Sequence, residues 1–280
     1  MSAPSNERGG AAAADPALTG VRSLLLDLDG CVWFGNELAD GAAEFVAGAR
    51  AAGLKVGFLT NTSSGTSAGL AAKLTQLGIP TTEEAVLMPI DALARHPLMQ
   101  DKPVTFVLGR PDVFEAVAAI TPVTTDPASA RLLVISRDPE MTYDELAAAG
   151  QVLVQGGDFL ALNLDGRVPV TGGRIVPGTG AIAAALTATS GVAPHSVGKP
   201  APFYFEVALE RFGMERASTV MVGDNLDSDI AGGNAASLRT VHVGGSSFTT
   251  RTPAPEPTLS VSDLRELGEV LELYATDYHR

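Results

Sequence analysis

The chain has 280 residues, of which 45% are hydrophobic and 18% charged, and its formal net charge is −13. This length and composition permit a large buried core in one or two domains. The acidic excess argues against a nucleic acid polymer or an anionic membrane as a principal partner, because contact with their phosphates requires a basic surface.

The N-terminal part of the chain combines a low-complexity segment with two strand–helix pairs. Residues 1–19 are rich in Ala, Gly and Pro, lack the sustained apolar segment of a signal peptide and are expected to form a disordered tail. Apolar runs then predict strands at 21–26 and 55–59, and Ala-rich stretches predict helices at 42–52 and 67–77. Such alternation is typical of a mostly parallel sheet with helices on both faces.

The middle of the chain repeats this alternation. Strands are predicted at 104–108, 132–136 and 159–163, and helices at 113–120 and 143–151. This set of elements could either continue the first sheet or form a domain of its own.

The last third of the chain has helices predicted at 179–190 and 202–212, with strands at 219–222 and 240–243. A further helix is expected after Asp229. A Pro- and Thr-rich linker at 249–257 precedes a final helix, which is predicted from apolar residues at helical spacing. These apolar residues are Leu264, Leu267, Val270 and Leu271.

Two acidic clusters nearly two hundred residues apart each follow an apolar run: Asp27-Leu28-Asp29-Gly30, and the segment from Asp224 to Asp229. Carboxylates just beyond the ends of parallel strands lie where α/β sheets bind ligands, and clustered oxygen ligands favour Mg²⁺. Taken alone, the first cluster is also typical of a turn and the second of a capped helix start. A Ca²⁺ loop is excluded, because its glycine and distal Glu are missing at the required spacing.

Two segments resemble nucleotide-binding patterns but lack the context that these patterns require. Gly178-Thr179-Gly180-Ala181-Ile182-Ala183 fits the dinucleotide pattern G-x-G-x-x-A, but no convincing strand precedes it and no strand-terminal acid follows at about 20 residues. A P-loop at Gly198-Lys199 is excluded, because Pro200 replaces the Ser or Thr that would bind Mg²⁺.

Four segments in chain order resemble the motifs of the haloacid dehalogenase-type phosphohydrolase superfamily. They are Asp27-Leu28-Asp29-Gly30, Leu59-Thr60-Asn61-Thr62, Gly198-Lys199-Pro200 and Gly223-Asp224 through Asp229. The long insertion between the second and third motifs is similar to the type IIA branch, which includes pyridoxal, phosphoglycolate, glycerol-phosphate and nitrophenyl phosphatases and a bacterial nucleotidase. The resemblance implies an α/β fold with a Rossmann-like parallel-sheet core, at 20–90 and 185–280, and an inserted α/β cap domain at 91–184.

The resemblance also implies roles for the acidic residues. Asp27 would be the nucleophile that forms an aspartyl phosphate, and Asp29 the general acid and base. Mg²⁺ would be held by Asp27, Asp224 and the backbone carbonyl of Asp29. Asp229 and Asn225 would orient these ligands without binding the metal themselves.

The remaining assignments concern the substrate. Thr60, Asn61, Thr62 and Lys199 would bind the phosphoryl group. By resemblance, the cap loop that contains Arg167 and Val168 would reach over the leaving group, where the arginine could grip a hydroxylated or anionic substrate or simply face solvent. Caps of this branch also often mediate dimerisation, so a homodimer through the cap is a further expectation.

The predicted function is a Mg²⁺-dependent phosphatase that hydrolyses a small phosphorylated sugar, polyol, glycolate or nucleotide monophosphate through an aspartyl phosphate. The acid at Asp29 favours phosphoryl transfer over carbon–halogen cleavage. A phosphotransferase or phosphomutase and a non-catalytic metabolite-binding protein remain as alternatives. The single cysteine and the lack of a stretch of roughly 20 apolar residues favour a cytoplasmic protein without a membrane partner.

Several residues near the motifs keep two interpretations. Cys31, where the family usually has Thr or Val, is either a small buried residue or a site of oxidation. Trp33 and Phe34 belong either to a short flap over the site or to the aromatic core. The histidines have no metal-ligand spacing and are expected at the surface or at edges: His96, His195, His242 and His279.

Overall fold

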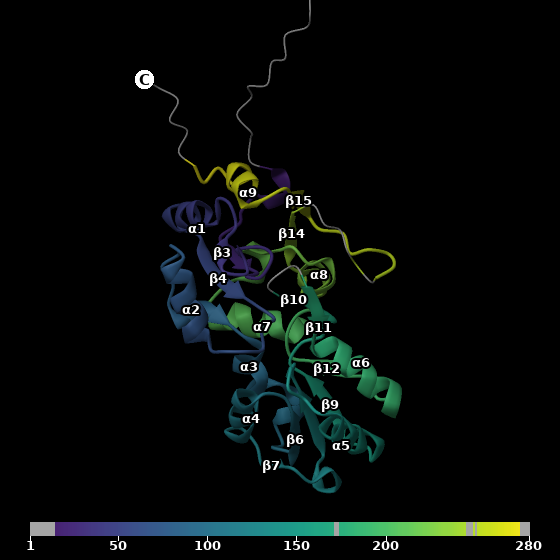
Figure 1. The fold of residues 1–280 in the computed structure, drawn as a ribbon. Helices are drawn as coiled ribbons and strands as arrows, with labels where there is room; N and C mark the ends of the chain where they lie inside the picture. The colour runs from purple at the N-terminus through teal and green to yellow at the C-terminus, as the bar shows by residue number, and fades with distance from the viewer. Residues whose placement is uncertain (1–14, 171–173, 245–248, 250, 275–280) are drawn as a thin grey trace, which may run out of the picture.

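The computed structural model describes residues 15–170, 174–244, 249 and 251–274, and it contains two large sheets (Figure 1). The first sheet has six strands in the order β15-β14-β13-β1-β4-β5, and its neighbouring strands pair in parallel. Its strands are β1 (Ser23–Leu26), β4 (Lys55–Leu59), β5 (Val86–Leu87), β13 (Thr219–Gly223), β14 (Arg239–Val243) and β15 (Leu259–Val261).

The second sheet has five parallel strands in the order β12-β9-β8-β6-β7. Its strands are β6 (Thr105–Leu108), β7 (Val123–Thr124), β8 (Leu132–Ile135), β9 (Asp158–Ala161) and β12 (His195–Ser196). The middle set of elements therefore builds a sheet of its own. The predicted parallel-sheet core with an inserted α/β cap is confirmed, and we call the two parts the core and the cap.

Helices cover both sheets, and two short antiparallel hairpins project from them. The helices are α1 (Ala42–Ala51), α2 (Ser67–Gln76), α3 (Pro89–Ala92), α4 (Pro111–Ala118), α5 (Tyr143–Val154), α6 (Thr179–Ser190), α7 (Pro202–Arg211), α8 (Ala231–Ala235) and α9 (Leu264–Val270). The hairpins pair β2 (Trp33–Phe34) with β3 (Glu37–Leu38), and β10 (Arg167–Val170) with β11 (Arg174–Pro177). In Figure 1 the described ends of the chain lie at the end of the core opposite the cap. Among the described residues, no helix has both the length and the apolar character needed to cross a bilayer.

Two elements of the fold bear on the boundary that the sequence predicted between the cap and the second part of the core. The limit at 184 divides helix α6, whose buried Ile182 and Leu186 pack with Val152 of α5 in the cap. Strand β12 also belongs to the cap sheet, because it pairs with β9. We therefore propose that the cap extends to about residue 196.

The last residues of the tail expected at 1–19 are structured. Residues 1–14 lie outside the described part of the chain, but Pro16–Leu18 form one turn of 3-10 helix. Asp15 caps this turn by accepting a hydrogen bond from the Ala17 N–H at 2.8 Å. Leu18 is buried in the core, so burial of one apolar side chain orders a segment whose composition alone suggests disorder.

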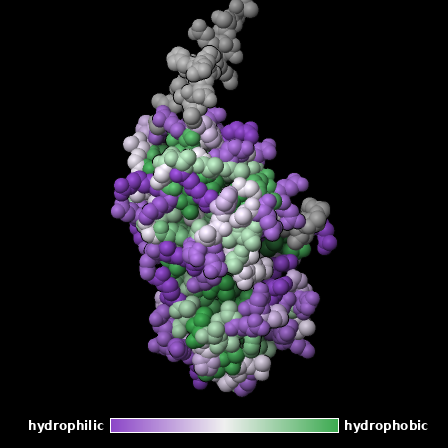
Figure 2. All heavy atoms as spheres, turned by 90° about the vertical axis from the view of Figure 1, so that its left-hand side faces the viewer, coloured by the Kyte–Doolittle hydropathy of each residue, from purple (hydrophilic) through white to green (hydrophobic). Residues whose placement is uncertain are grey.

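The two sheets share an apolar cluster. Leu25 and Leu59 of the core sheet belong to the same continuous cluster as Leu132, Val134 and Leu160 of the cap sheet. Apolar atoms also reach the surface where the two halves of the molecule meet, on the face in Figure 2. The cap is thus joined to the core by buried hydrophobic contacts as well as by the two chain crossings.

A buried tyrosine fixes two strand ends of the core to each other. The hydroxyl of Tyr204 in α7 lies 2.8 Å from the carbonyl oxygens of both Thr60 and Leu87, and the side chain is fully buried. The Thr60 carbonyl directly follows β4, and the Leu87 carbonyl belongs to the last residue of β5. The Leu87 carbonyl already accepts from the Thr60 N–H at 3.3 Å, so the hydroxyl proton is available to the buried carbonyl of Thr60 at the sheet edge.

Replacing this tyrosine tests that role. We expect Tyr204→Phe to lower the free energy of unfolding by about 1–2 kcal/mol, because the buried carbonyl of Thr60 loses its donor. Urea unfolding measures the change. The matched control is Tyr143→Phe, since Tyr143 is 83% exposed and its substitution should stay within about 0.5 kcal/mol of wild type. Equal effects of the two substitutions would contradict the role.

The histidines correct an expectation. His96 and His242 are buried, with 7% and 5% of their surfaces exposed, whereas His195 is exposed and His279 lies outside the described residues. His96 packs edge-on against Phe203, and its ring lies 6.4 Å from that of His195. Local sequence gives no signal for this burial, because the rings that pack against His96 come from a segment about a hundred residues away in the chain.

Burial and the neighbouring His195 lower the pKa of His96 from 6.5 to about 4. Between these values the unfolded chain binds more protons, so the stability due to neutral His96 is fully present above pH 6.5 and lost as the pH falls toward 4. His96→Asn keeps an acceptor for the Leu98 N–H but does not titrate. We expect this variant to lose less stability than wild type between pH 6.5 and 4.5 in urea unfolding. Parallel pH profiles would contradict the assignment.

Candidate active site

Three motif segments follow neighbouring strands of the core sheet. Asp27 follows β1, Asp224 follows β13 and Thr60 follows β4, and β1 lies between the other two strands. The main-chain N–H of Asp27 continues the ladder by donating to the carbonyl oxygen of Val222 at 2.9 Å. Because parallel strands end at one edge, segments distant in sequence meet there.

Three carboxylates form a cluster at this edge. Oxygen atoms of Asp27, Asp224 and Asp229 all lie within 4.8 Å of one another. Asp27 and Asp229 are buried, and Asp224 is half-buried. Hard oxygen ligands at this density suit a divalent cation such as Mg²⁺.

Glycine at two positions permits this density. A Cβ atom at Gly30 would lie 2.4 Å from a carboxylate oxygen of Asp224, and one at Gly223 would lie 2.2 Å from an oxygen of Asp229. Gly30 also has a φ of +93°, in the left-handed region that favours glycine. Both glycines belong to the sequence motifs, and close approach of a carboxylate explains each of them.

Lys199 brings a positive charge into the cluster. Its Nζ atom lies 2.5 Å from Oδ1 of Asp27 and 2.7 Å from Oδ1 of Asp229, and the side chain is almost fully buried. Burial by itself would lower the pKa of Lys199, but the charges of Asp229 and Asp27 raise it above its ordinary value. The lysine is therefore a permanent cation.

One ammonium does not balance three carboxylates. Burial raises the pKa of Asp27 well above its ordinary value, and Lys199 offsets this only in part. Burial, followed by the charge of Asp229, raises the pKa of Asp224 to about 7. The cluster therefore has an excess of negative charge that a bound divalent cation would relieve, and the donor set fits that ion.

Asp229 belongs to a single helical turn, Leu226–Ile230, and Asn225 caps the start of this turn. The side chain of Asn225 accepts hydrogen bonds from the N–H groups of Asp227 and Ser228, at 2.9 and 3.1 Å. The N–H of Asn225 donates to the second oxygen of Asp229 at 3.1 Å. Asn225 thus shapes the turn that aims Asp229 at Lys199.

The Asn61 side chain connects the second and third motifs. Its Nδ2 donates to the carbonyl oxygen of Lys199 at 2.9 Å and to Oδ1 of Asp165 at 3.2 Å, and its Oδ1 accepts from the Lys199 N–H at 2.8 Å. Both N–H groups of the amide are therefore used. A phosphoryl oxygen would have to be bound by the main-chain N–H of Asn61 or replace one of these bonds.

Asp29 and Thr62 meet at the rim of the site. The Thr62 hydroxyl donates to Oδ2 of Asp29 at 2.9 Å, and the indole N–H of Trp33 donates to Oδ1 at the same distance. The Thr62 N–H donates to the Thr60 hydroxyl oxygen at 3.0 Å. The sequence placed Thr62 with the phosphoryl ligands and gave Trp33 no polar contact, since only the fold brings the indole N–H to the carboxylate.

A cap loop at 163–166 contacts the second motif directly. Asn163 donates from Nδ2 to the carbonyl oxygen of Asn61 at 2.8 Å, and Asp165 accepts from the same residue. Burial raises the pKa of Asp165 to about 6, although Lys199 lowers it. Arg167, which is exposed, and Val168, which is half-buried, follow this loop at the start of β10.

The Gly-Thr-Gly segment anchors this cap loop. The N–H of Gly180 donates to the carbonyl oxygen of Asp165 at 2.9 Å, and a Cβ atom at Gly180 would lie 2.2 Å from the carbonyl oxygen of Leu164. Contrary to expectation, a strand does precede this segment, but within the described part of the chain β11 pairs with β10 alone, in an antiparallel hairpin. The dinucleotide pattern, which the sequence context already disfavours, therefore has another cause here: the backbone of a protein loop packs directly against these glycines.

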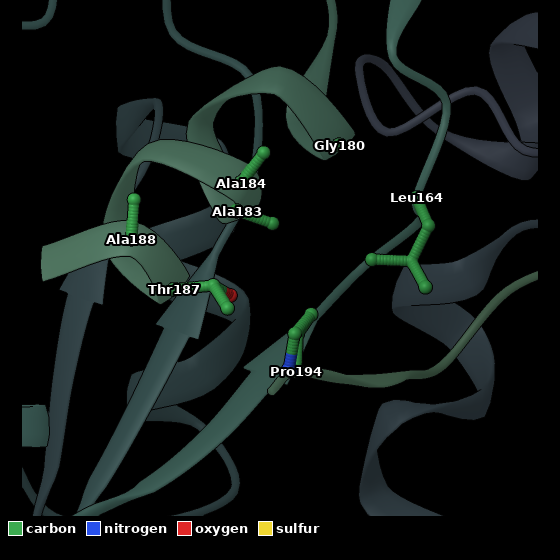
Figure 3. Close-up of a pocket in the computed structure, with 7 residues that line it drawn as sticks. All are labelled: Leu164, Gly180, Ala183, Ala184, Thr187, Ala188 and Pro194. Atoms are coloured by element: carbon green, nitrogen blue, oxygen red, sulfur yellow. The ribbon is translucent and has the colours of Figure 1, made fainter. Parts of the chain in front are cut away.

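A hollow of about 410 Å³ lies on the other side of the loop (Figure 3). Its lining is almost entirely apolar and contains no titratable side chain. It consists of Leu164, Gly180, Ala183, Ala184, Thr187, Ala188 and Pro194. This hollow offers no group for chemistry, so the carboxylate cluster is the candidate active site.

Two family models match this chain. The model described as haloacid dehalogenase-like hydrolase matches residues 24–121, and the model described as HAD-hydrolase-like matches residues 196–267. Together they cover the segments that contain Asp27, Asn61, Lys199 and Asp224.

Curated relatives and solved structures agree with these models. The chain is 33% identical to 5'-nucleotidase YutF of Bacillus subtilis, over 88% of this chain and 96% of that protein. It is 31% identical to the acid sugar phosphatase of Staphylococcus saprophyticus, over 90% of this chain and 98% of that one. Its fold is similar to that of a glycerol phosphate phosphatase from Mycobacterium tuberculosis in complex with magnesium, with a TM-score of 0.79, 29% identity, and coverage of 90% and 77% of the two chains.

The anchoring of the cap loop can be tested through stability. We expect Gly180→Ala to lower the free energy of unfolding by about 1–3 kcal/mol, because the new methyl group meets the backbone of Leu164. Gly150→Ala is the matched control, since a Cβ atom at this position meets Thr189 at an ordinary 3.5 Å. This substitution removes a glycine from the middle of helix α5. It should stabilise the protein by roughly 0.5–1 kcal/mol. Stabilisation by both substitutions in thermal unfolding would contradict the packing described for Gly180.

Proposed function

Because this chain belongs to the haloacid dehalogenase-like hydrolase family and is a phosphatase of its type IIA-like branch, we propose that it hydrolyses a small phosphorylated metabolite through an aspartyl phosphate, with Mg²⁺ as cofactor. The substrate classes are sugar phosphates, polyol phosphates, phosphoglycolate and nucleotide monophosphates. The observation that supports this best is the buried Asp27 carboxylate, held against Lys199 beside Asp224 at the edge of the core sheet.

The proposed reaction has two steps. In the first, a carboxylate oxygen of Asp27 forms a bond to phosphorus while the bond from phosphorus to the leaving oxygen breaks, and Asp29 gives that oxygen a proton. In the second, Asp29 takes a proton from water as the water oxygen bonds to phosphorus. The bond to Asp27 then breaks, which releases inorganic phosphate and restores the Asp27 carboxylate and the protonated Asp29.

The residues around Asp27 support its attack. Lys199 fixes one oxygen of the nucleophile and carries the positive charge that a phosphoryl group requires. Thr60 and Asn61 follow the adjacent strand, and the Thr60 hydroxyl and the main-chain N–H of Asn61 would donate to the phosphoryl oxygens, since the Thr62 hydroxyl donates to Asp29. Donors held this rigidly lose little order when the reaction proceeds, which favours the transition state.

Mg²⁺ would be held by the carboxylates of Asp27 and Asp224 and by the backbone carbonyl of Asp29, with Asp229 and Asn225 holding these ligands in position. When bound, the ion offsets the repulsion between these carboxylates and the phosphate. The excess negative charge of the cluster supports this assignment.

The cap would determine which leaving group fits. The cap loop that contacts Asn61 contains Asp165, and Arg167 and Val168 follow directly after it. These three residues are therefore the cap side chains that we assign to the leaving group. Asp165 could accept hydrogen bonds from substrate hydroxyl groups, and Arg167 could contact a hydroxylated or anionic leaving group. Closure of the cap would exclude water from the phosphoryl group during the first step.

The reaction can be tested by phosphate release from a panel of phosphomonoesters, with Mg²⁺ and with chelator. We expect Asp27→Asn to lower kcat by at least about 10³-fold, because the amide is not a competent nucleophile, and chelator to abolish release by wild type. Asp227→Asn is the matched control, since Asp227 lies in the same acidic segment but outside the carboxylate cluster, and it should retain activity. Absence of release by folded, Mg²⁺-replete wild type would instead favour a phosphomutase or a binding protein.

A further inference from the structure

The hairpin β2–β3 begins four residues after Asp29 and turns back onto it. The N–H of Gly30 donates to the carbonyl oxygen of Trp33 at 2.8 Å, and the N–H of Trp33 donates to the carbonyl oxygen of Leu28 at 3.0 Å. These bonds close a tight loop between the residue before Asp29 and the indole. The position of the Trp33 side chain relative to Asp29 is therefore set by main-chain geometry.

The indole of Trp33 is almost fully buried, with 1% of its surface exposed, and its N–H donates to Oδ1 of Asp29 at 2.9 Å. The Thr62 hydroxyl donates to the other oxygen, Oδ2, at 2.9 Å. Each oxygen of the carboxylate thus has its own donor, and the two donors come from different segments of the chain. Two donors on two oxygens define the plane of a carboxylate, whereas one donor would leave it free to rotate.

Lys73 of helix α2 holds the indole in place. Its Nζ atom lies 4.0 Å from the centre of the Trp33 ring, in the geometry of a cation–π interaction. The same atom donates to the carbonyl oxygen of Gly35 at 2.7 Å. The lysine therefore contacts both the ring and the turn between β2 and β3, and links them to helix α2.

Asp29 itself is exposed, and an exposed aspartate samples several side-chain rotamers unless neighbouring groups fix it. Proton transfer to a leaving oxygen requires the donor to lie within hydrogen-bond reach of it. We propose that Trp33, with Thr62 as the second donor, is a positioning residue that orients the Asp29 carboxyl group toward the leaving-group oxygen. This inference rests on the acid–base role of Asp29 in the proposed function.

A purely structural role makes different predictions. A buried indole N–H needs an acceptor, and Asp29 could serve only that need. In that case, loss of the indole would change stability but would affect the hydrolysis of all substrates alike. Positioning of a proton donor instead matters most for substrates whose leaving group must be protonated.

The hydrogen bond can be tested without activity, because Trp33 is the single tryptophan of the chain. In protein labelled with ¹⁵N at tryptophan, one indole N–H cross-peak is expected. Asp29→Ala should move this peak upfield and speed its exchange with solvent, whereas Asp227→Asn should leave it in place. An unchanged peak in Asp29→Ala would overturn the contact on which the proposal depends.

The positioning role can be tested by comparing two leaving groups. Nitrophenolate leaves without protonation, whereas an alkoxide does not, so general acid catalysis matters mainly for alkyl phosphates. We expect Trp33→Phe to lower kcat about tenfold or more for the best alkyl monoester of the panel and less than about threefold for nitrophenyl phosphate. This loss is a fraction of the roughly 10²- to 10⁴-fold that general acid–base catalysis contributes.

Phe34→Leu is the matched control, because Phe34 is the neighbouring aromatic of the same hairpin and is 63% exposed. It should leave the ratio of the two rates unchanged. Thr62→Val, which removes only the second donor, should change the ratio in the same direction as Trp33→Phe and provides the test if Trp33→Phe does not fold. Equal loss of both rates in Trp33→Phe and in Thr62→Val would overturn the proposal.

Asp29→Asn separates failure of this inference from failure of the proposed function. If Asp29→Asn lowers alkyl ester hydrolysis selectively but neither Trp33→Phe nor Thr62→Val does, only the positioning role is wrong. If Asp29→Asn shows no selectivity for alkyl esters, the acid–base role of Asp29 is wrong, and the positioning role fails with it.

Discussion

The concentration of three carboxylates in a largely buried space is the constraint on which the rest of the site depends. Such a cluster is unstable without cations, and the ammonium of Lys199 supplies one of them from the interior. The main chain of that lysine is in turn fixed by Asn61, whose amide both donates to it and accepts from it. The third motif is therefore anchored by the second. A shift of either segment would move the Lys199 ammonium relative to the carboxylates and disturb the charge balance of the cluster.

Strand ends were readable from the sequence because hydrophobic runs, acidic clusters and glycine are local signals. The pattern located Asp27 and Asp224 beyond two strands, and the sheet order brings them together. Strands of two residues, such as β5 and β12, have too little length for any periodicity to show. The hydrogen bonds of Asn61 and Trp33 join residues through the folded backbone, so composition and spacing could not reveal them.

Gly178 and Gly180 show how one local pattern can arise from two physical needs. A dinucleotide site uses glycine so that a pyrophosphate can approach the backbone. Here the same freedom from side chains lets another stretch of backbone approach, at Leu164 and Asp165. The glycine pattern therefore indicates that some group approaches the backbone closely, but it does not identify that group. The pairing of the neighbouring strands distinguishes a ligand from another part of the chain.

The apolar cluster shared by the two sheets bears on how this protein could be recombined with its relatives. Leu25 and Leu59 of the core belong to one buried cluster with Leu132, Val134 and Leu160 of the cap, so the cap is not a detachable module. A chimera that exchanged the cap at its two crossings alone would leave one half of this cluster facing mismatched side chains or water. Substrate preference and hydrophobic packing are thus inherited together, and transfer of one requires transfer of the other.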